Sequence, residues 1–256
     1  MQIGIVGKPN VGKSTFFSAA TMASAEIAAY PFTTIKANKG VAFVRGRCPH
    51  LDFNTQCVPR NAGCENGTRL VPVELLDVAG LVPDAWQGRG LGNQFLDDLR
   101  QANVLIHVVD ASGATDIEGN SVPPGSHDPV EDIKFLEKEI AFWIRGILDK
   151  GWEKAARQAH LTNQPMEPVI HDRLTGLGVT EAQVSAALRD VHPPENPMNW
   201  DPEVMLNIAH AIRKYSKPMI IALNKADATD DATLQRLIKA ADLAVPTLSL
   251  IHISEP

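Results

Sequence analysis

The stretch GKPNVGKS, from Gly7 to Ser14, constrains the fold of this chain more than any other. It matches the pattern G-x-x-x-x-G-K-[ST] and lies between a short apolar run at residues 2–7 and a helix-compatible run that begins at Lys13. Strand, glycine-rich loop and helix in that order are the context in which the pattern binds phosphate, because backbone N–H groups and the helix N-terminus both favour an anion. A chance glycine-rich turn is the alternative, and this context disfavours it.

The residues of this loop have distinct predicted roles. Lys13 can reach the β- and γ-phosphate oxygens as a point charge, and Ser14 can ligate Mg²⁺. We expect the whole loop and the residue after it to contact a nucleotide: Gly7, Lys8, Pro9, Asn10, Val11, Gly12, Lys13, Ser14 and Thr15.

Four further runs predict strands: 40–45, 70–78, 104–110 and 219–224. The first two are β-branched and favour an antiparallel pair, whereas the last two are almost continuously apolar, which is typical of parallel strands buried on both faces. Helix-compatible segments, for example 94–102 and 231–243, lie between the strands. This alternation predicts an α/β fold with a doubly wound, mostly parallel sheet. Together with the phosphate loop of residues 7–14, it is typical of P-loop nucleotide hydrolases.

The interval between Asp110 and Lys217 is too long for one crossover between strands. Apolar residues recur in it at three- and four-residue spacing, which predicts an amphipathic helix. These residues are Ile133, Leu136, Ile140, Ile144 and Ile147. Further helical stretches near 179–190 and 202–215 are separated by proline-rich turns, so we expect a helical insertion at 128–213.

The tetrapeptide NKAD, from Asn224 to Asp227, directly follows an apolar run. A carboxylate at Asp227 can accept both N–H donors of guanine, and adenine does not present donors in that arrangement. The Lys225 stem can lie along the base, and Asn224 can tie this loop to the phosphate loop. Alone, N-K-x-D is a common pattern, but downstream of a phosphate loop and at the end of a predicted strand it is specific.

Two stretches between these motifs are expected to sense the last phosphate. In YPFTTI, Thr33 and Thr34 both qualify to close a Mg²⁺ shell, and we choose Thr34 from its place in the P-x-x-T pattern; strand propensity is the alternative explanation of the pair. In DVAG, Asp77 would hold Mg²⁺ through water, and the Gly80 N–H would meet the γ-phosphate. Leu81 follows, where the best-known GTPases have a glutamine that orients water, and leucine cannot form that hydrogen bond.

A cysteine cluster lies in a polar, turn-rich insert between two predicted strands. Cys48, His50, Cys57 and Cys64 supply four soft ligands that could bind Zn²⁺ tetrahedrally. Their spacing is not the paired C-x-x-C of standard zinc sites, so the sequence favours a surface hairpin with incidental thiols over a zinc site.

The bulk composition excludes several classes of protein. The net charge of −6 argues against DNA binding through bulk positive charge, and no apolar run approaches the roughly 18–20 residues of a membrane span. Three cysteines are too few for a disulfide framework, and an odd number cannot all pair. The sequence begins with a predicted strand rather than with a signal segment. We therefore expect a cytoplasmic protein with neither a membrane nor DNA as a partner.

The motifs GKPNVGKST, YPFTTI, DVAGLVPDAWQGRGLGNQFLDDLR and NKAD, in this order and with a helical insertion before the last, resemble the YchF/Obg-like GTPases, and the archaeal-type YchF branch most. The resemblance extends to about Thr247. It implies a P-loop GTPase domain of the TRAFAC class over residues 1–247, dependence on Mg²⁺, and a translation-associated role with ribosome contact. Bacterial and eukaryotic YchF-like proteins carry N-x-x-E and resemble ATPases in preference, whereas Asp227 here predicts GTP over ATP.

The resemblance also implies a hydrophobic residue in place of the catalytic glutamine, as Leu81 is. Asn10 could help to hold a K⁺ ion that neutralises transition-state charge, or it could merely stabilise the loop turn. A partner such as the ribosome could instead supply the missing group. Gln87 and Arg89 are expected to be solvated loop residues rather than catalytic ones. The residues expected to carry a slow intrinsic hydrolysis are Lys13, Thr34, Gly80 and Asn10.

The last residues, LSLIHISEP at 248–256, resemble the translation of a transposase adapter used in sequencing libraries. We expect them to be non-native, and a divergent strand is the alternative. The resemblance also leads us to expect a C-terminal TGS domain, which these 256 residues do not include. The functional hypothesis is a GTP-hydrolysing molecular switch; an ATP-preferring hydrolase and a nucleotide-stabilised module that binds a protein partner are the alternatives.

Overall fold

The computed structural model describes residues 1–21, 39–53, 55–60, 63–78, 80, 84, 86 and 98–248. Within these ranges the strands are β1 (Gln2–Val6), β2 (Lys39–Arg47), β3 (Gly63–Glu65), β4 (Thr68–Asp77), β5 (Val104–Asp110), β6 (Met219–Asn224) and β7 (Ala244–Pro246). The α-helices are α1 (Lys13–Thr21), α3 (Pro129–Asp149), α4 (Trp152–Thr162), α5 (Met166–Leu174), α6 (Glu181–Val191), α7 (Pro202–Ser216) and α8 (Asp231–Lys239). The 3₁₀ turns are η2 (Pro49–Leu51), η4 (Thr175–Leu177), η5 (Pro197–Asn199) and η6 (Ala226–Ala228).

One sheet organises the described strands in the order β2-β4-β1-β5-β6-β7, with β3 paired to β4. The pairs β4–β1, β1–β5, β5–β6 and β6–β7 are parallel, and β2 and β3 run antiparallel to β4. The register pairs Ile5 with Asp77 and Asp110 with Asn224, so the carboxyl ends of neighbouring strands meet at one edge. The predicted mostly parallel sheet is confirmed, and so is the predicted antiparallel pair.

The central strands are buried because helices cover both faces of the sheet. Leu105, Val108 and Val109 of β5 are all fully buried. Val108 packs with β1 and α1, whereas Val109 packs with α8. Both faces of β5 therefore meet apolar partners, as its continuous apolar run predicted.

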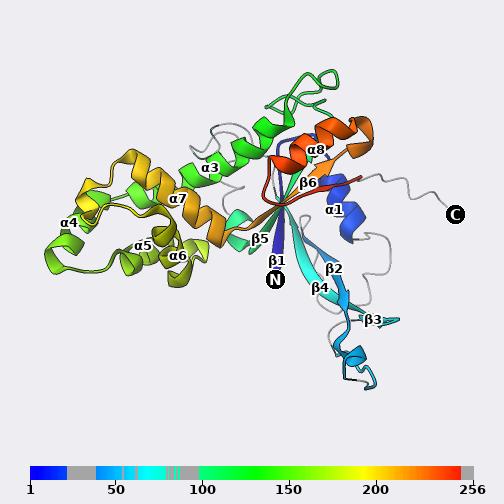
Figure 1. The fold of residues 1–256 in the computed structure, drawn as a ribbon, viewed down its shortest axis with the longest axis horizontal. Coiled ribbons are helices and arrows are strands. Elements are labelled where there is room, and N and C mark those ends of the chain that lie inside the picture. Colours follow the sequence, from blue (N-terminus) through cyan, green and yellow to red (C-terminus); the bar gives the residue numbers. More distant parts are fainter. Residues whose placement is uncertain are drawn as a thin grey trace.

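The helices α3 to α7 lie where we expected an insertion, to one side of the sheet, with α3 running from the sheet into them (Figure 1). The predicted apolar stripe of α3 is buried at Leu136, Ile140 and Ile144, in one cluster with Ile208 of α7. Helices α4 and α5 were not predicted. The helix predicted at 231–243 is shorter, because α8 ends at Lys239 and the chain turns into β7.

The hairpin of β2 and β4 extends away from the rest of the molecule and carries β3 and the short turn η2 at its far end (Figure 1). The two strands pair from Lys39 opposite Leu76 to Arg47 opposite Thr68. In the part of the chain that the structure describes, no helix is both long and apolar enough to cross a membrane.

Candidate functional site

The loop from Gly7 to Gly12 joins β1 to α1 in a conformation that its sequence makes accessible. Gly7 and Gly12 have φ values of 144° and 95°, and a Cβ on Gly7 would collide with the carbonyl oxygen of Val108. Asn10 has a left-handed φ of 62°, which asparagine tolerates better than most residues. The loop therefore wraps tightly between β5 and the start of α1.

Lys13 and Ser14 open α1 beside the end of β4. The Lys13 Nζ donates to the Lys8 carbonyl oxygen at 2.8 Å, and burial lowers the pKa of Lys13 to about 8, although Asp77 opposes that shift. The Ser14 hydroxyl donates to the Asp77 carboxylate at 3.1 Å. A Cβ on Gly80 would lie 3.3 Å from the Lys13 Nζ, so the backbone at Gly80 closely approaches this ammonium group. Four predicted site residues therefore meet at one edge of the sheet.

The N-K-x-D motif follows β6 and contacts the phosphate loop directly. The buried Asn224 donates from Nδ2 to the carbonyl oxygen of Val11 at 2.9 Å. Lys225 adopts a left-handed φ of 58°, and Asp227 is exposed in the turn η6. The expected tie between this motif and the loop is thus present in the structure as a hydrogen bond.

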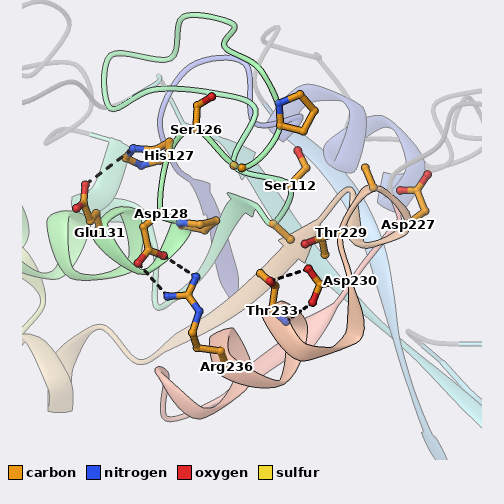
Figure 2. Close-up of a pocket in the computed structure, with 16 residues that line it drawn as sticks. Ser112, Ser126, His127, Asp128, Glu131, Asp227, Thr229, Asp230, Thr233 and Arg236 are labelled. Atoms are coloured by element: carbon orange, nitrogen blue, oxygen red, sulfur yellow. Dashed lines mark hydrogen bonds and ion pairs between the residues drawn. The ribbon is translucent and has the colours of Figure 1, made fainter.

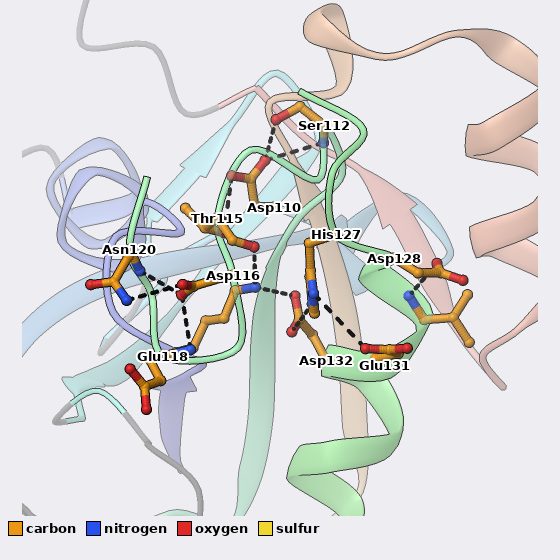
Figure 3. Close-up of polar contacts among 12 residues, drawn as sticks. Asp110, Ser112, Thr115, Asp116, Glu118, Asn120, His127, Asp128, Glu131 and Asp132 are labelled. Atoms are coloured by element: carbon orange, nitrogen blue, oxygen red, sulfur yellow. Dashed lines mark hydrogen bonds and ion pairs between the residues drawn. The ribbon is translucent and has the colours of Figure 1, made fainter. Parts of the chain in front are cut away.

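Asp110 ends β5 and connects the residues that follow this strand to the N-K-x-D motif; Figure 3 shows its contacts with Ser112 and Thr115. The sequence analysis did not identify it as a site residue. It is fully buried and accepts hydrogen bonds from the Ser112 backbone, the Ser112 hydroxyl and the Thr115 hydroxyl. The Lys225 Nζ lies 2.7 Å from its carboxylate. Burial raises the pKa of Asp110, but the hydrogen bonds from Lys225 and Ser112 outweigh this effect, so the pKa lies below its ordinary value. The carboxylate anion therefore holds Lys225 in place.

Lys8 belongs to the loop, but its side chain reaches Asp132 at the start of α3. Its Nζ lies 2.7 Å from the Asp132 carboxylate and 2.8 Å from the Thr115 carbonyl oxygen, and both charged side chains are almost fully buried. Asp132 also lies 2.8 Å from the ring of His127 (Figure 3). Only the backbone of Lys8 is thus available to a phosphate, and nothing in the sequence indicated its partner.

Asn10 is held by the loop that follows β5. Its Nδ2 donates to the carbonyl oxygen of Gly119 at 2.9 Å. Gly119 has a positive φ of 88° and sits so close to Pro9 that a Cβ would collide with the Pro9 backbone. This hydrogen bond uses the amide nitrogen of Asn10, whereas a cation would bind the amide oxygen.

An open pocket of about 1040 Å³ lies beside Asp227, between the segment after β5 and the start of α8 (Figure 2). Across it, Arg236 of α8 forms a two-pronged ion pair with Asp128, with both N–O distances at 2.9 Å. Asp128 also caps α3 by accepting from the Val130 N–H. The pocket is rich in polar groups and is large enough for a nucleoside.

Two described residues that follow DVAG, Asp84 and Trp86, contact α3. Glu139 of α3 accepts hydrogen bonds from the backbone N–H groups of Asp84 and Trp86 at 3.1 and 3.2 Å. The Trp86 ring also stacks on Phe142, with centroids 5.3 Å apart. Together with the ion pair of Lys8, these contacts bring the phosphate loop and two residues after DVAG to one helix.

Five residues of the sequence analysis lie outside the described residues: Thr33, Thr34, Leu81, Gln87 and Arg89. The tail beyond residue 248 also lies outside them. The cysteine cluster is described, and it lies at the far end of the β2–β4 hairpin rather than at the nucleotide motifs.

The profile of a family described as 50S ribosome-binding GTPase matches residues 2–143. An uncharacterized GTP-binding protein of Methanocaldococcus jannaschii is 51% identical over 255 residues, which cover 98% of this chain and 64% of that protein. The crystal structure of a GTP binding protein from Pyrococcus horikoshii OT3 is 43% identical, with a TM-score of 0.79, and is matched over 97% of this chain and 64% of that one.

A more distant relative carries a different nucleotide in its name. The ribosome-binding ATPase YchF of Bacillus subtilis is 42% identical over 139 residues, which cover 54% of this chain and 35% of that protein. The chain thus spans less than two thirds of the length of these three relatives.

Proposed function

The chain belongs to the 50S ribosome-binding GTPase family, and we propose that it binds GTP and hydrolyses it to GDP and phosphate. The observation that carries the proposal is the hydrogen bond from Asn224 to the Val11 carbonyl oxygen. It joins the base-reading motif to the phosphate loop, so a single nucleotide can span both. Asp227 then reads the guanine through its two N–H donors, beside the polar pocket of Figure 2.

Lys13 is the principal electrostatic group. Its ammonium lies inside the loop and close to Gly80, where the β- and γ-phosphates would be cradled. A pKa of about 8 leaves Lys13 mostly protonated at neutral pH, and a bound triphosphate favours the charged form further. Its charge stabilises the negative charge that shifts toward the leaving GDP.

Ser14 and Asp77 fit a Mg²⁺ site, since a hydroxyl and a carboxylate oxygen lie 3.1 Å apart at the phosphate loop. We assign Ser14 as a direct ligand and Asp77 as a ligand through water, with Thr34 as the third protein group. When bound, Mg²⁺ would neutralise charge on the β- and γ-phosphates.

Helix α3 is positioned to report the state of the nucleotide. Lys8 links the phosphate loop to Asp132. Glu139, on the same helix, binds the backbone of Asp84 and Trp86. We propose that GTP orders Thr34 and Gly80 around the γ-phosphate, that hydrolysis releases them, and that α3 passes this change to the helices α4 to α7. The ribosome is the proposed partner, because it is named for the family and for the Bacillus subtilis relative.

Leu81 cannot orient the attacking water by a hydrogen bond, so another group must assist hydrolysis. We propose that the amide oxygen of Asn10 helps to hold a K⁺ ion, since the hydrogen bond to Gly119 uses only the amide nitrogen. The test is single-turnover GTP hydrolysis in K⁺ against Na⁺. Asn10→Gly is the informative variant, because glycine keeps the left-handed backbone and removes the amide.

The outcomes separate two sources of catalytic help. Faster hydrolysis in K⁺ that Asn10→Gly abolishes supports the ion. Equal and slow rates in both salts support a catalytic group supplied by the ribosome. Purified 50S subunits should then raise the rate of hydrolysis. Equal and fast rates in both salts would contradict both.

ATP is the second candidate substrate, because the Bacillus subtilis relative is named an ATPase. Competition of unlabelled ATP and GTP against a fluorescent GTP analogue decides between them. We expect GTP to compete at least about 100-fold better, because a carboxylate left unpaired against adenine costs binding energy. Equal competition by the two nucleotides would contradict the preference for GTP and would favour ATP as a substrate.

A further inference from the structure

We propose that Cys48, His50, Cys57 and Cys64 hold a structural zinc ion at the far end of the β2–β4 hairpin. One ligand atom from each residue lies within 4.8 Å of all the others. The sequence analysis favoured incidental thiols because these residues lack a paired spacing. The fold, however, brings together residues from three separate segments of the hairpin.

The distances between the ligand atoms suit a tetrahedrally coordinated ion. The Cys48 and Cys57 sulfur atoms are 3.6 Å apart, and the Cys64 sulfur lies 3.7 Å from the His50 Nδ1. A tetrahedron with Zn–S bonds of about 2.3 Å and a Zn–N bond of about 2.0 Å has edges of roughly 3.5–3.8 Å. The cysteines are free thiols, and 3.6 Å is far longer than a disulfide bond.

The backbone fixes three of these ligands before any ion binds. The Cys48 N–H donates to the Gly67 carbonyl oxygen at 2.8 Å, which anchors the end of β2 to the turn between β3 and β4. The turn η2 follows at once and carries His50. Cys64 lies in β3, where it pairs with Arg69 of β4. The short strand and the turn therefore direct their ligands to one point.

The hairpin tip has little apolar burial of its own. Phe53 and Val58 are each 78% exposed, and Leu51 is 48% exposed. Cys48 is the exception, at 1% exposure. A connection of this length without a core needs another source of order, and a metal ion can supply the free energy that apolar contacts do not.

Charge and ligand type select the ion. Three thiolates and one neutral imidazole suit Zn²⁺, and a complete set of four protein ligands is typical of structural rather than catalytic zinc. Binding displaces the three thiol protons and leaves the centre with one net negative charge. Arg69 donates from a guanidinium nitrogen to the Cys57 sulfur at 3.9 Å, so a cation already lies beside the thiolates.

The site is remote from the proposed hydrolysis site, because β4 separates them. Thr68 pairs with Arg47 at the zinc end, and Asp77 lies at the other end of the strand. Nine residue steps at about 3.3 Å each give a separation of about 30 Å. Loss of zinc should thus leave nucleotide hydrolysis unchanged, and failure of either proposal leaves the other intact.

The primary test is elemental analysis of the 256-residue chain, purified without chelators or metal-affinity columns and dialysed against metal-free buffer. We expect about one zinc per chain. Zinc below about 0.1 equivalents, or iron at about one equivalent, would overturn the proposal. Exchange of the ion for Co²⁺ should produce the visible bands of tetrahedral cobalt together with thiolate-to-cobalt charge transfer, and octahedral spectra would contradict the assignment.

Variants test the ligands individually. Cys57→Ser and His50→Asn should each reduce zinc several-fold, and the matched control His160→Asn, an exposed histidine on α4, should not. Hydrogen exchange keeps the test decisive if a variant folds poorly. Removal of zinc from the unmodified chain by chelation should lower protection in β3 and around Cys48 only. Unchanged protection there would show that no ion orders the hairpin tip.

Discussion

The carboxyl edge of the sheet and the helices α3 to α7 are built in opposite ways. At the sheet edge, charged groups are buried: Lys8, Lys13 and Asp110 are each at most 9% exposed, and Lys8 pairs with the buried Asp132 at the start of α3. In the helices, the largest fully buried side chains are aliphatic, such as Leu136, Ile170 and Ile208. Both regions are tightly packed. The helices also bury two charged side chains, Glu139 of α3 and Arg213 of α7, but apolar side chains dominate there.

This difference separates groups that serve chemistry from groups that serve stability. Burying an ion costs free energy that its partners only partly return, so a buried cluster of ions contributes little to stability. Apolar side chains that leave water stabilise directly, by about 1.5–3 kcal/mol each. We therefore expect substitutions at the sheet edge to alter nucleotide chemistry and substitutions in the helices to alter unfolding.

The largest effect is expected at Lys13. Lys13→Ala should lower single-turnover hydrolysis by about 10²–10³-fold, because no other described side chain places a cation inside the loop. The free energy of unfolding should stay the same or rise, since burial already lowers the pKa of Lys13. Phosphate release and urea unfolding measure the two quantities, with the exposed Lys214→Ala of α7 as the control. If rate and stability fell together, the proposed division between a chemical sheet edge and stabilising helices would be wrong.

Ile170 tests the helices. It is fully buried on α5, so Ile170→Ala should lower the free energy of unfolding by about 2–5 kcal/mol and Ile170→Val by about 0.5–1.5 kcal/mol. Affinity for GTP at a temperature where both variants are folded should not change. A loss of GTP affinity that scales with the lost stability would show that these helices are part of the nucleotide site.

Asp227 should affect specificity without affecting folding, because its side chain is exposed. Asp227→Asn should weaken GTP by about 100-fold and favour xanthosine triphosphate, whose base presents the complementary acceptor. Equilibrium binding of both nucleotides measures the change, and Asp231→Asn in the next helix is the control. Unchanged preference would remove Asp227 from the base-reading role.

The smallest effect is expected at Arg236. Its ion pair with Asp128 is about half exposed, so Arg236→Ala should lower stability at neutral pH by about 0.2–1 kcal/mol. Arg236 lowers the pKa of Asp128, so the stabilisation is present above the ordinary aspartate pKa and is lost as the pH falls through the lowered value. Urea unfolding at neutral and acid pH should show the difference from the parent disappearing in acid, whereas Arg157→Ala should show none at either pH.

The sequence predicted the membership of the family and most of the fold. The continuous apolar runs predicted β5 and β6, and the order of the motifs predicted the YchF/Obg-like GTPases, which the comparisons confirm. Helices α4 and α5 were missed because their apolar positions are few and short turns separate them. The end of α8 was misplaced because residues 240–243 have a helical composition but turn into β7.

Local sequence by itself determined the phosphate loop and the base motif. It also determined the apolar character of the strands that carry them. Each of these features depends on neighbouring residues and on backbone geometry. Only the tertiary structure decided where Lys8 points, that Asp110 fixes Lys225, and that four soft ligands meet at the hairpin tip. These contacts join residues far apart in the chain, or in segments without a regular period. Their pairing follows from how strands and helices pack, and no spacing in the sequence encodes it.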